Sequence, residues 1–227
     1  IAEAIFSDFH NEEIIWPSMS STMTPAPSTV SGGVSSLDVG NVRDSYPGSA
    51  SFAPNRNLYT IRASGSGVGG NNDGFHFVNQ KVSGDMTIVA LVEKINPDPT
   101  GYGQAGVMIR STLDGNSPNM FMRMTKTTGV YASWRTSVGG GTTEEGKKWN
   151  DSWEYAWVRI QREGDFLTSS RSVDGITWEE IATATISMPN AVEVGVVLAS
   201  GNYWESTLAE VNIRNVVITP VQSTTST

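Results

Sequence analysis

The chain has 227 residues, no cysteine, a formal net charge of −8 and an isoelectric point near 4.7. A chain of this length can bury a full hydrophobic core without disulfide bonds, and the lack of cysteine excludes disulfides and thiolate metal sites. The acidic charge excludes nucleic acids as partners, since phosphate binding requires a basic surface, and no stretch approaches the roughly 20 apolar residues that span a bilayer.

Residues 1–16 combine apolar and acidic side chains, and residues 17–37 are rich in Pro, Ser, Thr and Gly without periodicity, which is typical of a linker. The chain starts with Ile1 rather than Met, which favours removal of a signal peptide and secretion. An apolar arm on such a tether either adds a strand to its own domain or pairs with the open edge of a neighbouring copy. The predicted assembly residues of this arm are Ile5, Phe6, Phe9, Ile14, Ile15 and Trp16.

Residues 38–219 repeatedly alternate apolar and polar side chains, which predicts antiparallel β-strands. Clear examples are Met120, Met122 and Met124; Ala156, Val158 and Ile160; and Val192, Val194, Val196 and Leu198. A phase change after Leu208 predicts a β-bulge at that point. Turns such as Asp174-Gly175 separate the runs, and no segment shows a helical stripe. The prediction is an all-β, antiparallel two-sheet sandwich or jelly roll, followed by a Ser/Thr tail at 220–227.

Eight short motifs follow one another in a fixed order within this region. They are Asp38-Val39-Gly40, Pro47-Gly48-Ser49-Ala50, Gly65-Ser66-Gly67, Asp73-Gly74-Phe75-His76-Phe77, Ala105-Gly106-Val107-Met108-Ile109-Arg110, Trp134-Arg135-Thr136-Ser137, Trp157-Val158-Arg159 and Ser172-Val173-Asp174-Gly175-Ile176-Thr177-Trp178. Through this ordered set, residues 38–217 resemble the concanavalin A-like modules of secreted bacterial and archaeal proteins known as "regulation of enolase"-like. The resemblance implies an extracellular jelly roll that is appended to other domains, and it implies no particular activity.

Two positions depart from the pattern of that family. Val68-Gly69-Gly70 stands where family members carry an aromatic residue, and Ser170-Arg171 stands where they often carry paired tyrosines. Because aromatic rings stack on sugars, these departures argue against carbohydrate binding.

The carboxylate pattern argues against an enzyme. Glycosidases of this fold place two carboxylates about 5 to 9 Å apart across the scissile bond, whereas Glu144-Glu145 and Glu179-Glu180 are adjacent and point to opposite faces of a strand. A Ser-His-Asp triad would require His10 or His76. His76 lies between two phenylalanines in a predicted strand, which favours a structural role.

Aromatic residues and oxygen ligands supply the remaining candidates. The aromatic candidates for stacking on sugars or anchoring an interface are Trp149, Trp153, Tyr155, Trp157, Tyr203 and Trp204, with core packing as the alternative role. Asn72, Asp73 and Asp98 offer the oxygen ligands that Ca²⁺ prefers, although such residues also form plain turns. No other cofactor is predicted. Asn150 begins the only N-glycosylation sequon.

Together these features predict a secreted structural or adhesive protein at the cell surface. Its arm would join it to copies of itself in a filament or lattice, because head-to-tail contacts propagate. The alternative is a non-catalytic carbohydrate-binding module with a polysaccharide partner, and a glycoside hydrolase is less favoured.

Overall fold

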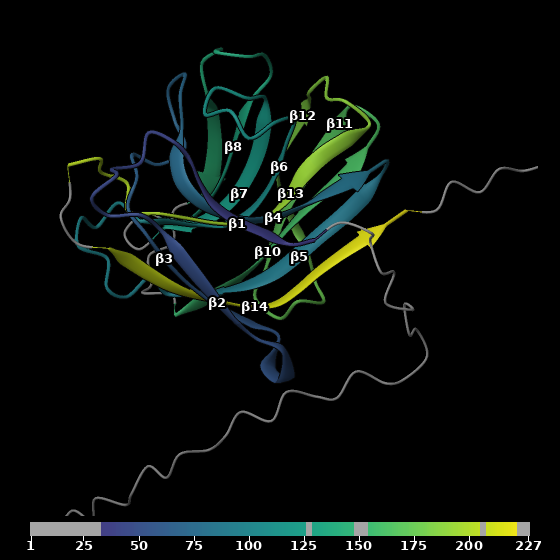
Figure 1. The fold of residues 1–227 in the computed structure, drawn as a ribbon. Coiled ribbons are helices and arrows are strands. Elements are labelled where there is room, and N and C mark those ends of the chain that lie inside the picture. Colours follow the sequence, from purple (N-terminus) through teal and green to yellow (C-terminus); the bar gives the residue numbers. More distant parts are fainter. Residues whose placement is uncertain (1–32, 126–128, 148–153, 205–207, 222–227) are drawn as a thin grey trace, which may run out of the picture.

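A computed structural model describes residues 33–125, 129–147, 154–204 and 208–221 and confirms the predicted two-sheet sandwich (Figure 1). Each sheet has seven strands, and all neighbouring strands are antiparallel. Sheet A contains, in spatial order, β1 (Ser35–Gly40), β4 (Gly74–Ser83), β13 (Ala191–Ala199), β6 (Gln104–Arg110), β7 (Asn119–Thr125), β8 (Gly129–Arg135) and β9 (Thr143–Lys147). Sheet B contains β12 (Glu179–Thr185), β11 (Phe166–Ser172), β10 (Tyr155–Glu163), β5 (Met86–Glu93), β14 (Ala209–Pro220), β3 (Leu58–Ala63) and β2 (Ser49–Ala53). A single 3₁₀ turn, Pro54–Arg56, joins β2 to β3 in the described part of the chain.

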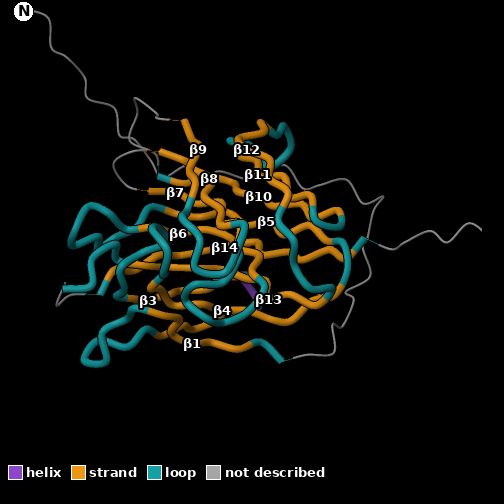
Figure 2. The backbone as a smooth tube through the Cα atoms, turned by 90° about the horizontal axis from the view of Figure 1, so that it is seen from above, coloured by secondary structure: helices purple, strands orange, loops and turns teal. Residues whose placement is uncertain are grey.

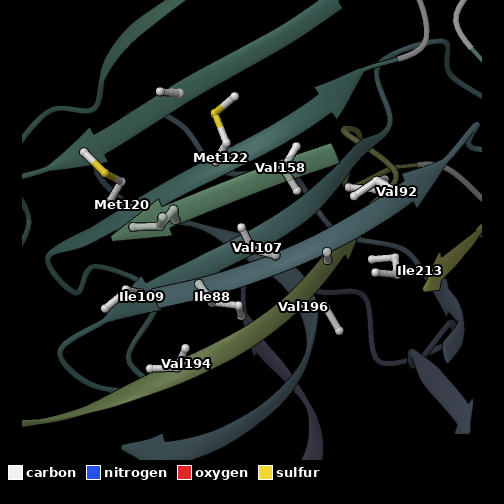
Figure 3. Packing of buried hydrophobic residues seen from close by; sticks show 14 of the residues in the cluster. Ile88, Val92, Val107, Ile109, Met120, Met122, Val158, Val194, Val196 and Ile213 are labelled. Atoms are coloured by element: carbon white, nitrogen blue, oxygen red, sulfur yellow. The ribbon is translucent and has the colours of Figure 1, made fainter. Parts of the chain in front are cut away.

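The main core lies between the sheets and consists of the apolar residues that alternate along the strands (Figure 3). The predicted faces of β7, β10 and β13 all point into it, and Met122, Val158 and Val194 are fully buried. Because successive side chains of a strand point to opposite sides, the polar residues between them lie on the outer faces. No helix of the described residues is long and apolar enough to cross a membrane.

The outer face of sheet A carries a second apolar cluster under a roof of loops. Its members are Val39, Val68, Phe75, Phe77, Met108, Phe121, Val197 and Ala199, each at most 2% exposed. The loop roof consists of residues 64–73, 111–118 and 136–142. Backbone hydrogen bonds join the three loops, from Asp73 to Gly115 and from Thr142 to Gly70, each at 2.8 Å. Figure 2, seen from above, shows loops crossing in front of strands of the sandwich.

Buried charges hold the loop roof together. Arg135 donates through Nη1 to Asp73 Oδ2 at 2.9 Å and through Nη2 to Asp73 Oδ1 at 2.6 Å. Arg110 lies 3.5 Å from the same carboxylate, and all three side chains are fully buried. Burial lowers the pKa of Arg110 to about 10, while Asp73 acts in the opposite direction. Since a buried charge requires a partner, the three residues depend on one another.

The irregularity in the last strand lies elsewhere than predicted. Ala209, Val211 and Ile213 alternate cleanly into the core, so the strand simply begins after Leu208. The register shifts instead between Arg214 and Val217, where Asn215 adopts a φ of 52°. The sandwich domain also begins earlier in the chain than predicted. Its first strand, β1, starts at Ser35, inside the segment that was predicted to be a linker.

Candidate functional site

A groove of about 560 Å³ opens in sheet B where β5 and β14 part. The strands pair as far as Val92 and Ile213, and their segments meet again where the Asn96 N–H donates to the Glu210 carbonyl at 2.8 Å. Three residues, 93–95, lie between these points on one segment and two, 211–212, on the other. The extra residue makes the first segment bulge away and opens the sheet.

The groove has a polar lining with an aromatic side chain at the start of β10. It is lined by Leu91, Glu93, Lys94, Asn96, Glu154, Tyr155, Glu210, Val211, Asn212 and Arg214. Carboxylates accept hydrogen bonds, Lys and Arg donate them, and amides do both. The ring of Tyr155, which is half-buried, adds an apolar surface to this set. Such a lining suits a ligand that carries many hydroxyl groups.

Every glutamate of the groove forms an ion pair with a basic side chain. The pairs are Glu93 with Arg214, Glu154 with Lys94 at 2.7 Å, and Glu210 with Arg62 at 3.3 Å. In addition, the Thr60 hydroxyl donates to Asn212 Oδ1 at 2.9 Å and fixes the amide of Asn212. Because the ion pairs are partly exposed, each contributes at most about 1 kcal/mol to stability. Their main effect is to fix the side chains and to balance the carboxylate charges.

A loop-end aromatic cluster, formed by Tyr46, Tyr102, Tyr203 and Trp204, lies on three loops. Trp204 is 78% exposed and Tyr102 is 71% exposed. The rings of Tyr203 and Trp204 meet edge to face, with centroids 5.0 Å apart. The Arg43 guanidinium lies 5.2 Å from the centre of the Tyr46 ring and donates to the Trp204 carbonyl at 3.4 Å. The sequence predicted Tyr203 and Trp204 and missed Tyr46 and Tyr102, which lie far away in the chain.

Polar residues beneath the cluster hold its loops in place. Ser200 donates through its backbone N–H to the Ser64 carbonyl at 3.4 Å, and its carbonyl accepts from the Thr100 hydroxyl at 2.5 Å. The Ser64 hydroxyl donates to the Tyr46 carbonyl at 2.8 Å. The exposed rings therefore stand on backbone that is fixed by hydrogen bonds, and a ligand that stacks on them need not order the loops.

The other predicted aromatic residues are placed as follows. Tyr155 lines the groove, whereas Trp157 is half-buried beneath the β11–β12 turn, where a Cβ on Gly175 would lie 2.9 Å from the indole ring. Trp149, Trp153 and the glycosylation candidate Asn150 lie outside the described residues. The assembly residues of the arm, Ile5 to Trp16, also lie outside them, so arm-mediated assembly stays a prediction.

Two of the three residues predicted as calcium ligands serve other roles. Asp73 is the carboxylate of the loop roof and is neutralised by guanidinium groups. Asp98 accepts hydrogen bonds from the backbone N–H groups of Gly101 and Gly103, at 3.0 and 3.2 Å, in a turn of its own. Asn72 is exposed on the loop roof. Within the described ranges, no group of three or more His, Cys, Asp or Glu side chains has the arrangement of a metal site.

The two departures from the family pattern fall at positions of mixed exposure, because Gly70 is exposed and Gly69 and Arg171 are partly exposed. Val68 is 2% exposed and packs under the loop roof, and Ser170 is 1% exposed. An aromatic residue at position 68 or 170 would be buried rather than offered to a sugar ring, whereas a Cβ at Gly69 or Gly70 would have no neighbour within 4 Å. The lack of an aromatic ring at positions 69 and 70 therefore still argues against sugar stacking at that loop.

Comparison with solved structures confirms the concanavalin A-like sandwich fold. A protein of unknown function from Saccharomyces cerevisiae matches with a TM-score of 0.64 and 16% identity, over 84% of this chain and 97% of that one. The carbohydrate-binding module CBM66 from Bacillus subtilis matches with a TM-score of 0.50 and 14% identity, over 80% and 94% of the two chains. A family 43 glycoside hydrolase from Bacillus licheniformis matches with a TM-score of 0.50 and 12% identity, over 71% of this chain and 33% of that larger one. At these identities the likeness establishes the fold alone.

No protein-family model matches the chain, and no curated protein matches it in sequence. Membership of the "regulation of enolase"-like family therefore stays a prediction.

Proposed function

We propose that this protein is a secreted carbohydrate-binding module that holds an oligosaccharide segment in the groove between β5 and β14. The observation that carries the proposal is the groove itself, with a volume of about 560 Å³, fixed polar side chains and the ring of Tyr155. This volume falls in the range of roughly 300–1,000 Å³ typical of small-ligand sites. The sandwich fold, shared with a carbohydrate-binding module, is compatible with this role but does not decide it.

The chemistry of the groove matches that of a sugar chain. The lining combines donors and acceptors in the Asn96 and Asn212 amides, the three glutamates and the basic residues, and hydroxyl groups can bind both kinds. The aromatic side chain of Tyr155 lines the groove and supplies the kind of ring on which sugars stack. Since the lining contains both signs of charge in pairs, it favours a neutral ligand over a strongly charged one.

The proposal includes binding without cleavage of the glycosidic bond. A glycosidase needs one carboxyl group as acid and a second as base or nucleophile. In the groove each glutamate is paired with a cation, so all three carboxylates are already engaged in ion pairs.

Titration calorimetry with soluble oligosaccharides of cellulose, chitin and xylan tests the proposal. One of these ligands should bind, and Tyr155→Ala and Asn212→Ala should each lower its affinity about tenfold, as expected for the loss of one stacked ring or one hydrogen-bonded amide. The matched control is Phe166→Ala, which removes an exposed aromatic ring at the opposite end of β10 and β11 and should leave binding unchanged. Binding that survives both groove substitutions, or no binding to any of the oligosaccharides, overturns the proposal.

A further inference from the structure

Three side chains at the free edge of sheet A form a continuous hydrogen-bonded row. The Ser36 hydroxyl lies 2.8 Å from Nε2 of His76, and Nδ1 of His76 lies 2.7 Å from Oδ1 of Asp38. Strand register produces the row, because Asp38 stands opposite His76 in the pairing of β1 with β4. Ser36 precedes Asp38 by two residues and so shares its face of β1.

The order of the atoms sets the proton positions. A carboxylate on Nδ1 favours the imidazole tautomer that carries its proton there, which leaves the lone pair of Nε2 free to accept the proton of the Ser36 hydroxyl. Serine nucleophiles require this arrangement: a base within hydrogen-bond reach and a third group that orients the base. The sequence predicted a structural His76, and the structure adds a serine at its second nitrogen.

The surroundings fix the base and expose the hydroxyl. His76 is 3% exposed, whereas Ser36 is exposed. Asp38 also accepts from the Gly48 N–H at 2.9 Å. A Cβ on residue 48 would lie 2.3 Å from Nδ1 of His76, so only glycine permits this approach. Burial raises the pKa of Asp38, but hydrogen bonds from His76 and Gly48 outweigh it, and the pKa lies below its ordinary value.

A crevice of about 150 Å³ adjoins the row, and its lining mixes valines with the polar residues Asn79 and Gln80. Its lining includes Val34, two residues before Ser36, and Val78, which stands opposite Ser36 in the register of β1 and β4. Tyr59 and Ile218 of sheet B form part of the other wall. A crevice of this size has room for a short acyl chain.

We propose that Ser36 and His76 are catalytic residues, with Asp38 as positioning residue, in the hydrolysis of esters of short acyl groups. The Ser36 Oγ forms a bond to the ester carbonyl carbon as its proton passes to Nε2 of His76. The bond from this carbon to the alcohol oxygen breaks, and the alcohol leaves with that proton. Water then attacks the acyl-serine, again giving a proton to His76, and the acid departs as the proton returns to Oγ.

The oxyanion of each tetrahedral intermediate needs hydrogen-bond donors. β1 is an edge strand that pairs only with β4, and none of the described residues forms a backbone hydrogen bond with the other edge of residues 35–39. The backbone N–H groups on that edge are donors of the kind that oxyanion holes use.

The test uses the full chain with p-nitrophenyl butyrate as substrate and an alkyl fluorophosphonate as covalent label. The wild-type protein should release nitrophenol and carry the label on Ser36, located by mass spectrometry of the labelled peptide. Ser36→Ala should lower the hydrolysis rate about a thousandfold and abolish labelling, as expected when a triad nucleophile is removed. The matched control is Ser35→Ala, which removes the neighbouring exposed hydroxyl and should change neither result.

The fold is checked by the thermal midpoint, which Ser36→Ala should leave unchanged because its side chain is exposed. His76→Gln should abolish labelling of Ser36. If this variant unfolds, the comparison of Ser36→Ala with Ser35→Ala still tests whether Ser36 is the nucleophile. Hydrolysis at the wild-type rate by Ser36→Ala, label at another residue, or no hydrolysis and no labelling overturns the proposal. None of these outcomes bears on the groove, since no sugar is used.

Discussion

Replacing Asp73 by asparagine should weaken the whole sandwich, although Asp73 lies in a loop. Asp73 receives two hydrogen bonds from Arg135, at 2.9 and 2.6 Å, and has Arg110 at 3.5 Å. All three side chains are fully buried. The asparagine keeps the size of the side chain but removes its charge, and its NH₂ group faces donors that it cannot satisfy. Two buried guanidinium groups are then left uncompensated.

Breaking a buried ion pair by removing one partner costs about 3–5 kcal/mol. In a domain of this size that loss corresponds to a thermal midpoint lower by about 10 °C. Urea unfolding followed by tryptophan fluorescence measures the free energy, and circular dichroism measures the midpoint. The control is Glu210→Gln, the same carboxyl-to-amide change in an ion pair whose side chains are 55% and 37% exposed. It should cost at most about 1 kcal/mol. Equal costs for the two substitutions would refute the reasoning, because burial then would not govern the strength of the pair.

Other predictions concern the stability of the core, the exposure of the aromatic cluster, the loss of stability in acid and the effect of a metal chelator. Met122→Ala, at a fully buried core position, should lower the free energy of unfolding by about 2–5 kcal/mol with an unchanged denaturant slope. Trp204→Ala should change this free energy by no more than about 0.5 kcal/mol, because the ring is 78% exposed; a larger loss would show that the ring packs in solution. The pKa of Asp38 is lower in the folded state, so the stability it contributes is present above its ordinary value of 3.8 and lost as the pH falls through the folded value; an acid titration of Asp38→Asn should lack this loss. A chelator should leave the thermal midpoint unchanged, because Asp73 is neutralised by arginine; a midpoint raised by added calcium would contradict this.

The strands could be predicted because side-chain alternation is a local signal. Val192 to Leu198 and Ala156 to Ile160 each repeat every second residue, and both runs proved to face the core. β1 was harder to find, because its first residues, Ser35 and Ser36, continue a run of serine and glycine that has the composition of a linker. Its order comes from pairing with β4, which the local sequence does not encode.

The candidate sites depend on residues that are distant in the chain. Asp73 meets Arg135 across 62 positions, and His76 meets Ser36 across 40. An Asx-Gly motif such as Asp73-Gly74 occurs both in calcium sites and in plain turns. Composition alone could therefore not show that the Asp73 carboxylate forms an ion pair with an arginine. The groove depends on one extra residue after β5, and this count is visible only once β14 is known to be its neighbour. Within the groove, Tyr155 alone carried a usable signal, an aromatic residue at the start of an alternating strand.

The loop roof separates the side chains that fix its backbone from those that meet the solvent. Asp73, Arg110 and Arg135 are buried, while Asn71, Val138 and other residues at the crest of the same loops are exposed. Sequence changes at the crest should therefore leave the framework intact, because surface substitutions away from buried networks cost little. This makes the roof a natural scaffold for engineering, in which combinatorial libraries at the exposed positions could be selected for new targets without redesigning the domain beneath.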